Sequence, residues 1–157
     1  MLSIILPSTV AGQVALFVGQ GVAALVLVAI VYRRMANKSR GVINAIDNIS
    51  QGLTLFDANN RLVVRNRRYI EMYKLSPEVV KPGCSLHELI QHRKDTGIFS
   101  GDVDAYCQKI LDTLVKTEKN SFYIEASDGH IILIKNHRLA DGGWVSTHED
   151  VTEQRQA

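Results

Sequence analysis

The chain has 157 residues, of which 46% are hydrophobic and 22% are charged, a composition typical of a folded globular protein rather than of a disordered one. Its formal net charge is +2, so no strong basic field points to nucleic acid as a partner. The average hides a sharp division, because residues 1–32 contain no Asp, Glu, Lys or Arg. We therefore expect an apolar appendage followed by one ordinary domain.

The appendage contains the run VAGQVALFVGQGVAALVLVAIVY, residues 10–32. A helix of this length, at about 1.5 Å per residue, can cross a hydrocarbon core of about 30 Å. A secretory signal peptide is the alternative, but it has a basic segment ahead of the apolar run, and residues 1–9 hold no basic side chain. The sequence predicts an uncleaved transmembrane helix over residues 10–32, with membrane lipid as its surroundings.

The flanks of this run predict its orientation. Arg33, Arg34, Lys38 and Arg40 follow it closely, and the positive-inside rule places such a cluster in the cytoplasm. We expect a single-pass protein of the inner (cytoplasmic) membrane, with residues 1–9 outside and the C-terminal domain inside. In that reducing compartment the two cysteines, Cys84 and Cys107, are expected to be thiols.

Residues 33–51 have the spacing of an amphipathic connecting helix. Val42, Ile43, Ile46 and Ile49 form its apolar stripe, and Gly52 is expected to end it. The stripe could pack on the chain's own domain, or it could form the seam of a homodimer with the same helix of a second copy. Because two chains anchored in one bilayer meet at high effective concentration, we expect a homodimer.

The following residues change to a β-rich pattern. Two short apolar runs around the turn Ala58, Asn59 and Asn60 predict a hairpin over residues 53–66. Helical spacing follows in RRYIEMYKL, in SLHELIQHR and in DVDAYCQKILDTLVKT, the last two capped by Ser85 and Asp102. Three further strands, SFYIEA, HIILIKNHRL and WVSTHED, close the chain. The predicted class is α+β, with helices on one face of an antiparallel sheet.

The chain closes on an acidic residue followed three positions later by Glu153, which predicts a capping box between Asp150 and Glu153. Residues 152–157 would then be the start of a helix.

Alternation along the strands nominates one set of side chains for the inner face of the sheet, opposed by apolar side chains from the helices. These residues could fill a solid core or line a small cavity for an apolar or mixed ligand. The set consists of Leu53, Leu55, Val63, Phe122, Ile124, Ile132, Ile134 and Val145 from the strands and Leu89, Ile90, Ile110 and Leu114 from the helices.

Catalysis is not expected from this chain. No phosphate loop, HExxH or GxSxG motif orders its cysteines and histidines, and no metal site is predicted. His87 and His92 are five residues apart, which on a helix gives poorly matched faces for one metal ion. His137 and His148 lie in strands and could be surface residues or groups that titrate near neutral pH, and we expect them at the surface.

Two stretches resemble a known family. IDNISQGLTLFDANNRLVVRNRRYIEMYKLSPE is similar to the opening of a PAS domain, and ASDGHIILIKNHRLADGGWVSTHEDVTE is similar to its closing strands. Asp150, Val151 and Thr152 stand where the family has its terminal Asp-x-Thr signature. The resemblance implies a PAS domain over residues 52–151, with a five-stranded antiparallel sheet and helices on one face. It is closest to the PAS type found near the membrane in bacterial histidine kinases and diguanylate cyclases.

The resemblance also implies a function. It predicts a sensory or relay module that acts by binding a ligand or partner and displacing a helix, with Asp150, Thr152 and Glu153 as the junction to a signalling helix. A kinase or cyclase output domain would then act in cis or in trans, and the alternative is a sensory fragment of such an enzyme. Photochemistry with flavin is unsupported, because PGCSLHELI lacks the family's Asn-Cys-Arg-Phe-type motif. A second alternative is a haem-dependent gas or redox sensor that uses His87 or His92; otherwise no cofactor is expected.

Overall fold

A computed structural model describes residues 26, 27, 29–31 and 40–157 of the chain. The chain divides into two compact units, Met1–Asn44 and Ala45–Ala157. In the described part of the first unit, residues 26, 27 and 29–31 and residues 40–44 are helical. Among the described residues, no helix has both the length and the apolar character that a membrane crossing requires. Most of the predicted transmembrane segment, residues 10–32, lies outside the described residues, as do residues 1–9 and 33–39.

The second unit is an α+β domain, as the sequence predicts. Its elements follow one another as two strands, three helices, three strands and a short helix, which are β1 (Gly52–Phe56), β2 (Leu62–Arg65), α2 (Arg67–Met72), α3 (Leu86–Asp95), α4 (Val103–Lys116), β3 (Lys119–Glu125), β4 (Ile131–Arg138), β5 (Trp144–Asp150) and α5 (Thr152–Gln156).

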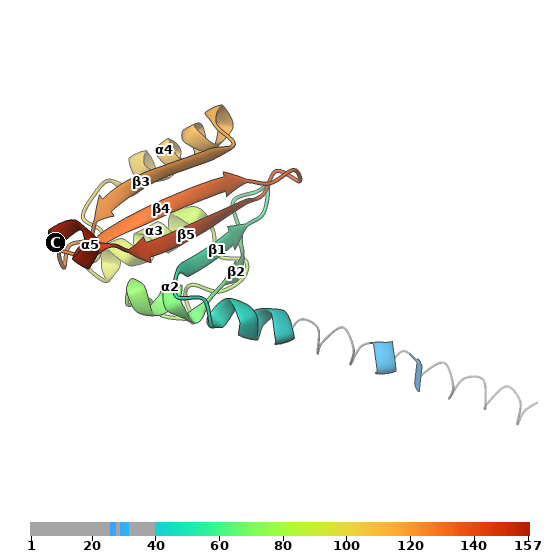
Figure 1. Cartoon of the computed structure of the whole chain (residues 1–157). Helices are drawn as coiled ribbons and strands as arrows, with labels where there is room; N and C mark the ends of the chain where they lie inside the picture. Colours follow the sequence, from blue (N-terminus) through green and yellow to red (C-terminus); the bar gives the residue numbers. More distant parts are fainter. Residues whose placement is uncertain (1–25, 28, 32–39) are drawn as a thin grey trace, which may run out of the picture. The chain divides into compact units, whose positions relative to one another are not determined.

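The five strands form one antiparallel sheet in the order β2-β1-β5-β4-β3. The first hairpin therefore lies against the last strand, because β1 pairs with β5 from Gly52 opposite His148 to Phe56 opposite Trp144. The two ends of the domain's sequence thus meet in the middle of the sheet (Figure 1).

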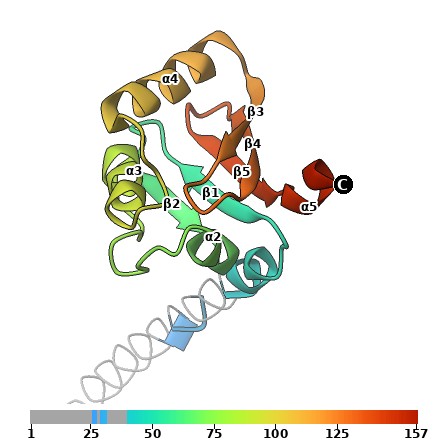
Figure 2. The same cartoon turned by 90° about the vertical axis from the view of Figure 1, so that its left-hand side faces the viewer.

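The helices α3 and α4 lie on one side of the sheet, and α5 lies on the other side (Figure 2). Local sequence explains where these helices begin. Ser85 and Glu88 form a complete capping box at α3, and the side chain of Asp102 accepts a hydrogen bond from the backbone of Ala105 at α4. Both predicted caps are confirmed.

The connecting helix ends earlier than the sequence predicts. Residues 40–47 are helical, but residues 48–51 are not, and Gly52 is already the first residue of β1. Gly52 has a packing role rather than a helix-ending role. A Cβ atom at this position would lie 3.1 Å from the backbone Cα of Tyr69, so β1 and α2 approach closely here.

Four residues that the sequence analysis placed on the inner face lie elsewhere. Leu53, Leu55 and Val145 are half-buried on the outer face of the sheet, and Val63 is 43% exposed. Both faces of these strands carry apolar residues, so alternation alone did not determine which set turns inward. Three of the inner positions of β1 and β5 are polar, and the Ser146 and His148 side chains among them are hydrogen-bonded inside the domain. These inner residues are Gly52, Thr54 and Phe56 in β1 and Trp144, Ser146 and His148 in β5.

Candidate functional site

The helices and the inner face of the sheet enclose a cavity of about 20 Å³, the space of about one water molecule. Its lining is mixed, with polar side chains from the sheet and apolar side chains from α3 and α4. It consists of Thr54, Phe56, Tyr69, Leu86, Leu89, Ile90, Arg93, Tyr106, Ile110, Phe122, Ile134, Asn136, Trp144, Ser146 and His148. Five of the predicted lining residues, Leu89, Ile90, Ile110, Phe122 and Ile134, are therefore in place. Leu114 and Ile132 are buried in the core, and Ile124 packs against it, but none of these three lines the cavity.

Arg93 is the one charged side chain in this lining. It comes from the inner face of α3, and only 3% of its surface is exposed. Its guanidinium lies 3.8 Å from the centroid of the Tyr73 ring and donates a hydrogen bond from Nη2 to the hydroxyl of Tyr69. Such contacts with aromatic faces favour a cation, but they do not neutralise it.

No acidic side chain faces this guanidinium in the lining. Burial raises the pKa of the Tyr69, Tyr73 and Tyr106 hydroxyls, and although the charge of Arg93 opposes that shift, all three remain neutral phenols at physiological pH. An arginine guanidinium stays protonated even when buried. The interior of the domain therefore carries a net positive charge.

His148 lies in the same region and corrects the prediction that it is a surface residue. It is only 4% exposed, because it occupies an inner position of β5. Its Nδ1 lies 2.6 Å from the hydroxyl of Tyr73, and its Nε2 lies 2.9 Å from the hydroxyl of Ser146. Burial, together with the charge of Arg93, lowers the pKa of His148 well below its ordinary value. The imidazole is therefore neutral.

Three buried polar atoms have no hydrogen-bond partner in the described part of the chain. They are Nε of Arg93, Nδ2 of Asn120 and Oδ1 of Asn136. The two amides bond to each other once, from Nδ2 of Asn136 to Oδ1 of Asn120 over 3.1 Å. A buried unpaired donor or acceptor costs free energy, and two of these atoms belong to Arg93 and Asn136, which line the cavity.

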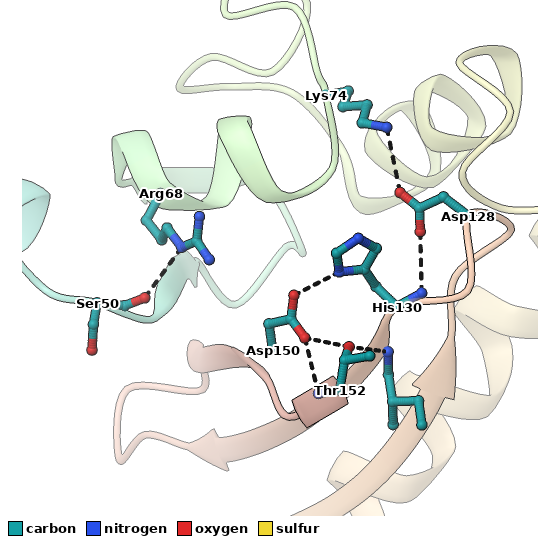
Figure 3. Close-up of polar contacts among 8 residues, drawn as sticks. Ser50, Arg68, Lys74, Asp128, His130, Asp150 and Thr152 are labelled. Atoms are coloured by element: carbon teal, nitrogen blue, oxygen red, sulfur yellow. Dashed lines mark hydrogen bonds and ion pairs between the residues drawn. The ribbon is translucent and has the colours of Figure 1, made fainter. Parts of the chain in front are cut away.

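A second polar cluster joins the end of β5 to the start of α5 (Figure 3). One carboxylate oxygen of Asp150 accepts hydrogen bonds from the backbone nitrogen of Thr152 over 3.0 Å and from its hydroxyl over 2.5 Å. The other lies 2.7 Å from Nδ1 of His130, and the Thr152 hydroxyl in turn accepts from the backbone nitrogen of Ile131. Asp150 and Thr152 thus tie the end of β5 and the start of α5 to the start of β4.

The predicted capping box is wrong in its details. The residue before α5 is Val151, its side chain provides no cap, and the carboxylate of Asp150 reaches only as far as Thr152. Glu153 is exposed. Partial burial opposes ionisation of Asp150, but the hydrogen bonds from Thr152 and His130 prevail and hold its pKa below the ordinary value. Asp150 is therefore an ionised link between strands.

The turn before β4 extends this cluster toward α2. Asp128 accepts a hydrogen bond from the backbone of His130 and forms a 3.4 Å ion pair with Lys74, just after α2 (Figure 3). Arg68 of α2 donates to the carbonyl of Ser50, ahead of β1. The polar contacts around the junction therefore involve α2 as well as the sheet.

Residues 46–157 match the PAS fold family. This chain belongs to that family. A curated relative, the non-motile and phage-resistance protein of Caulobacter vibrioides, is 30% identical over 109 residues. The match covers 69% of this chain but only 12% of the relative. The predicted resemblance is confirmed, and the PAS domain described here is a sensory domain of the kind found in histidine kinases and other signalling proteins.

Solved structures of low sequence identity share the fold. The PAS domain of Bordetella pertussis BvgS has a TM-score of 0.54 at 14% identity, and the alignment covers 76% of this chain and 90% of that one. The photoactive yellow protein domain of the sensor histidine kinase Ppr from Rhodospirillum centenum has a TM-score of 0.51 at 13% identity, covering 69% and 92%. At such identities the likeness concerns the fold alone.

The two histidines considered as haem ligands do not reach the cavity of the PAS domain. His87 is exposed, with its Nε2 2.9 Å from Asp104, and Nε2 of His92 accepts a hydrogen bond from the backbone of Ser76. A cavity of about 20 Å³ has no room for a porphyrin. Among the described residues, no cluster of His, Cys, Asp and Glu is placed to hold a metal ion. The geometry therefore gives a haem site no support.

The cysteines are free thiols, as predicted. Both are buried, and burial raises the pKa of Cys84 and of Cys107, which disfavours the nucleophilic thiolate. Of the predicted dimer seam, Val42, Ile43 and Ile49 are exposed, and Ile46 is half-buried.

Sequence reasoning missed Arg93, although a signal was present. Leu86, Leu89, Ile90 and Arg93 follow the three-to-four residue spacing of one helix face, so a charged residue continues an apolar stripe. Likewise, Thr54, Asn136, Ser146 and His148 recur at alternate positions of apolar strands. Polar residues in these patterns could have been interpreted as the lining of a polar cavity.

Proposed function

We propose that this protein is a membrane-anchored cytoplasmic signalling module whose PAS domain relays the binding of a ligand or partner as a displacement of its C-terminal helix. The charge-free residues 10–32 and the basic cluster behind them support the anchor and its orientation. Membership of the PAS family supports the sensory role.

The observation that carries the relay is the position of Asp150. Its carboxylate holds both Thr152, the first residue of α5, and His130, just ahead of β4. A shift of β5 relative to β4 therefore changes the contacts that position the start of α5. In addition, His148, on the cavity, is only two residues before Asp150 on the same strand. This continuity along β5 supports a relay from the cavity to the junction.

A second candidate is the sensory part of a histidine kinase or diguanylate cyclase. The Caulobacter relative favours it, because the matching region occupies only 12% of that protein. In both cases α5 is expected to pass the signal to an output enzyme, which lies either in the same chain (in cis) or in another protein (in trans). The genomic reading frame after the codon of Ala157 distinguishes the two candidates: an in-frame catalytic domain supports the second.

Reporter fusions at the C-terminus test the anchor. A reporter that works only in the cytoplasm is expected to be active, and one that works only in the periplasm is expected to be inactive. The opposite pattern would refute the proposed orientation. Recovery of the protein in the soluble fraction after cell lysis, rather than with membranes, would refute the anchor itself.

A further inference from the structure

The uncompensated charge of Arg93 is the starting point. Arg93 is only 3% exposed, and it lines the cavity. Its Nε has no hydrogen-bond partner within the described part of the chain. A buried cation without a counter-charge is costly, whereas a bound anion would remove that cost. Arginine presents its donors in a planar fork that matches a carboxylate.

The neutral state of His148 supplies a further donor. A neutral imidazole has one N–H donor and one acceptor nitrogen. It is hydrogen-bonded to the hydroxyls of both Tyr73 and Ser146, so it accepts a hydrogen bond from one hydroxyl and donates a hydrogen bond to the oxygen of the other. The second hydroxyl keeps its proton for another acceptor. In the tautomer with the proton on Nε2, that hydroxyl is Ser146, which lines the cavity together with Arg93 and can offer its O–H group to an anion there.

The apolar part of a ligand also has a place. A groove of about 270 Å³ runs between α4 and the edge strand β3. It shares three of its lining residues, Tyr106, Ile110 and Phe122, with the cavity. Tyr106 is half-buried and lines both spaces, so a rotation of this side chain would join them. The groove is lined mainly by apolar surface and by the aliphatic side chains of Ile110 and Ile124.

We propose that the PAS domain binds an organic monocarboxylate with a short apolar tail, its carboxylate on Arg93 and Ser146 and its tail in the groove between α4 and β3. This inference rests on the proposed sensory function and names the class of its ligand. Binding would place an anion beside β5, whose Ser146 and His148 lead directly to Asp150.

The single tryptophan allows a direct test. Trp144 lines the cavity and stacks on Phe56 at a centroid distance of 4.3 Å, so its fluorescence responds to changes in the cavity. The full-length protein in detergent micelles is titrated with hexanoate, and with hexanamide as an uncharged analogue of the same length. A saturable change with hexanoate, and at least a 10-fold weaker one with hexanamide, is expected. Equal responses to both, or no response to hexanoate, would overturn the proposal.

Arg93→Met tests the residue itself. Methionine keeps most of the side-chain length and removes the uncompensated charge, so the variant is expected to fold. Because hydrogen bonds to a charged group contribute strongly, hexanoate affinity should fall roughly 10- to 100-fold. Arg138→Met is the matched control, since Arg138 is exposed on β4, and it should bind as the parent protein does. Unchanged binding by Arg93→Met, or an equal loss in the control, would contradict the assignment.

Tyr106→Phe is a second variant that tests the same binding site if Arg93→Met does not fold. It removes one hydroxyl near Arg93 and retains the ring that packs 4.9 Å from Phe99. Without this competing acceptor, hexanoate should bind about 3- to 10-fold more tightly. Unchanged or weaker binding would contradict the proposed route. These readouts do not require signalling output, so a relay that works while hexanoate fails to bind would overturn this inference and leave the proposed function standing.

Discussion

The hydroxyl of Tyr73 lies 2.6 Å from Nδ1 of His148, and this buried hydrogen bond joins the end of α2 to the last strand of the sheet. The ring of Tyr73 also lies under the guanidinium of Arg93. One aromatic side chain therefore connects α2, α3 and β5 around a neutral histidine. Burial and the charge of Arg93 therefore lower the pKa of His148 and disfavour its protonation in the folded domain.

The first prediction is that the domain loses stability in mild acid because of His148. Its folded-state pKa is well below the ordinary value of about 6.5, so the unfolded chain binds the proton first. This contribution is fully present above about pH 6.5 and is lost as the pH falls below it, with a slope of at most about 1.4 kcal/mol per pH unit.

Chemical denaturation at about pH 7.5, 6.5 and 5.5 measures this effect, because these values bracket the ordinary histidine pKa of about 6.5. His148→Gln should show a shallower fall in unfolding free energy than the parent protein, although it is less stable at pH 7.5. The same substitution at exposed His137 is the control and should keep the parent slope. An identical pH dependence for His148→Gln and the parent would show that His148 is not the responsible group.

The second prediction concerns the junction. Asp150→Ala removes the acceptor for Thr152 and the partner of His130, with an expected cost of about 1 to 2 kcal/mol because the carboxylate is partly solvated. That is small beside a typical stability of about 5 to 15 kcal/mol, so the domain should stay folded. Signalling or partner binding should weaken, since α5 loses its attachment to the sheet.

Thermal melting and partner pull-down are measured together for this variant. Asp150→Asn is the matched comparison, because it keeps an acceptor for Thr152 but loses the charge facing His130, and it should give an intermediate result. A collapsed fold would make Asp150 a stability residue. Normal pull-down by Asp150→Ala would instead show that the junction does not transmit the signal.

The third prediction contrasts two glycines. A Cβ atom at Gly143 would lie 2.6 Å from the carbonyl oxygen of Phe56, which is backbone and cannot move without distorting the pairing of β1 with β5. Gly143→Ala should therefore destabilise the domain by about 1 to 3 kcal/mol. At Gly101 the nearest atom, at 2.7 Å, belongs to the ring of Phe99, which can rotate away.

Gly101→Ala is thus the control, with an expected change within about 0.5 kcal/mol. Urea unfolding of both variants gives the free energy of unfolding from the midpoint and slope of each transition. Similar losses at the two positions would mean that the close approach to the Phe56 carbonyl is not what requires glycine.

The fourth prediction concerns the proposed homodimer. Ile43 is 52% exposed, and two chains anchored in one bilayer meet at high effective concentration. If the stripe of Val42, Ile43, Ile46 and Ile49 forms the seam, Ile43→Glu should lower crosslinking yields in membranes several-fold, because it buries a charge between the helices.

Gly41→Glu adds the same charge on the helix away from the stripe, where a Cβ atom would meet nothing within 4 Å, and serves as the control, which should crosslink like the parent protein. Crosslinking that survives Ile43→Glu unchanged would exclude this stripe as the dimer interface.

The amino-acid sequence by itself determined the order and type of the elements in the PAS domain. Hairpin turns, the helix caps at Ser85 and Asp102 and the Asp-x-Thr ending are local signals, since each depends on residues a few positions apart. Only the tertiary structure decided which strand face turns inward. Leu53 and Thr54 are equally able to face the core until β5 lies beside β1 and offers Ser146 opposite Thr54.

The same reason explains the site. His148 is an ordinary strand histidine in the sequence, and Arg93 is an ordinary charge on a helix. They acquire their properties from Tyr73, which contacts both although it is 75 residues away from His148 in the chain. Burial and hydrogen bonding between residues distant in sequence determine the charge states inside the domain, and such contacts leave no periodic pattern in any single segment.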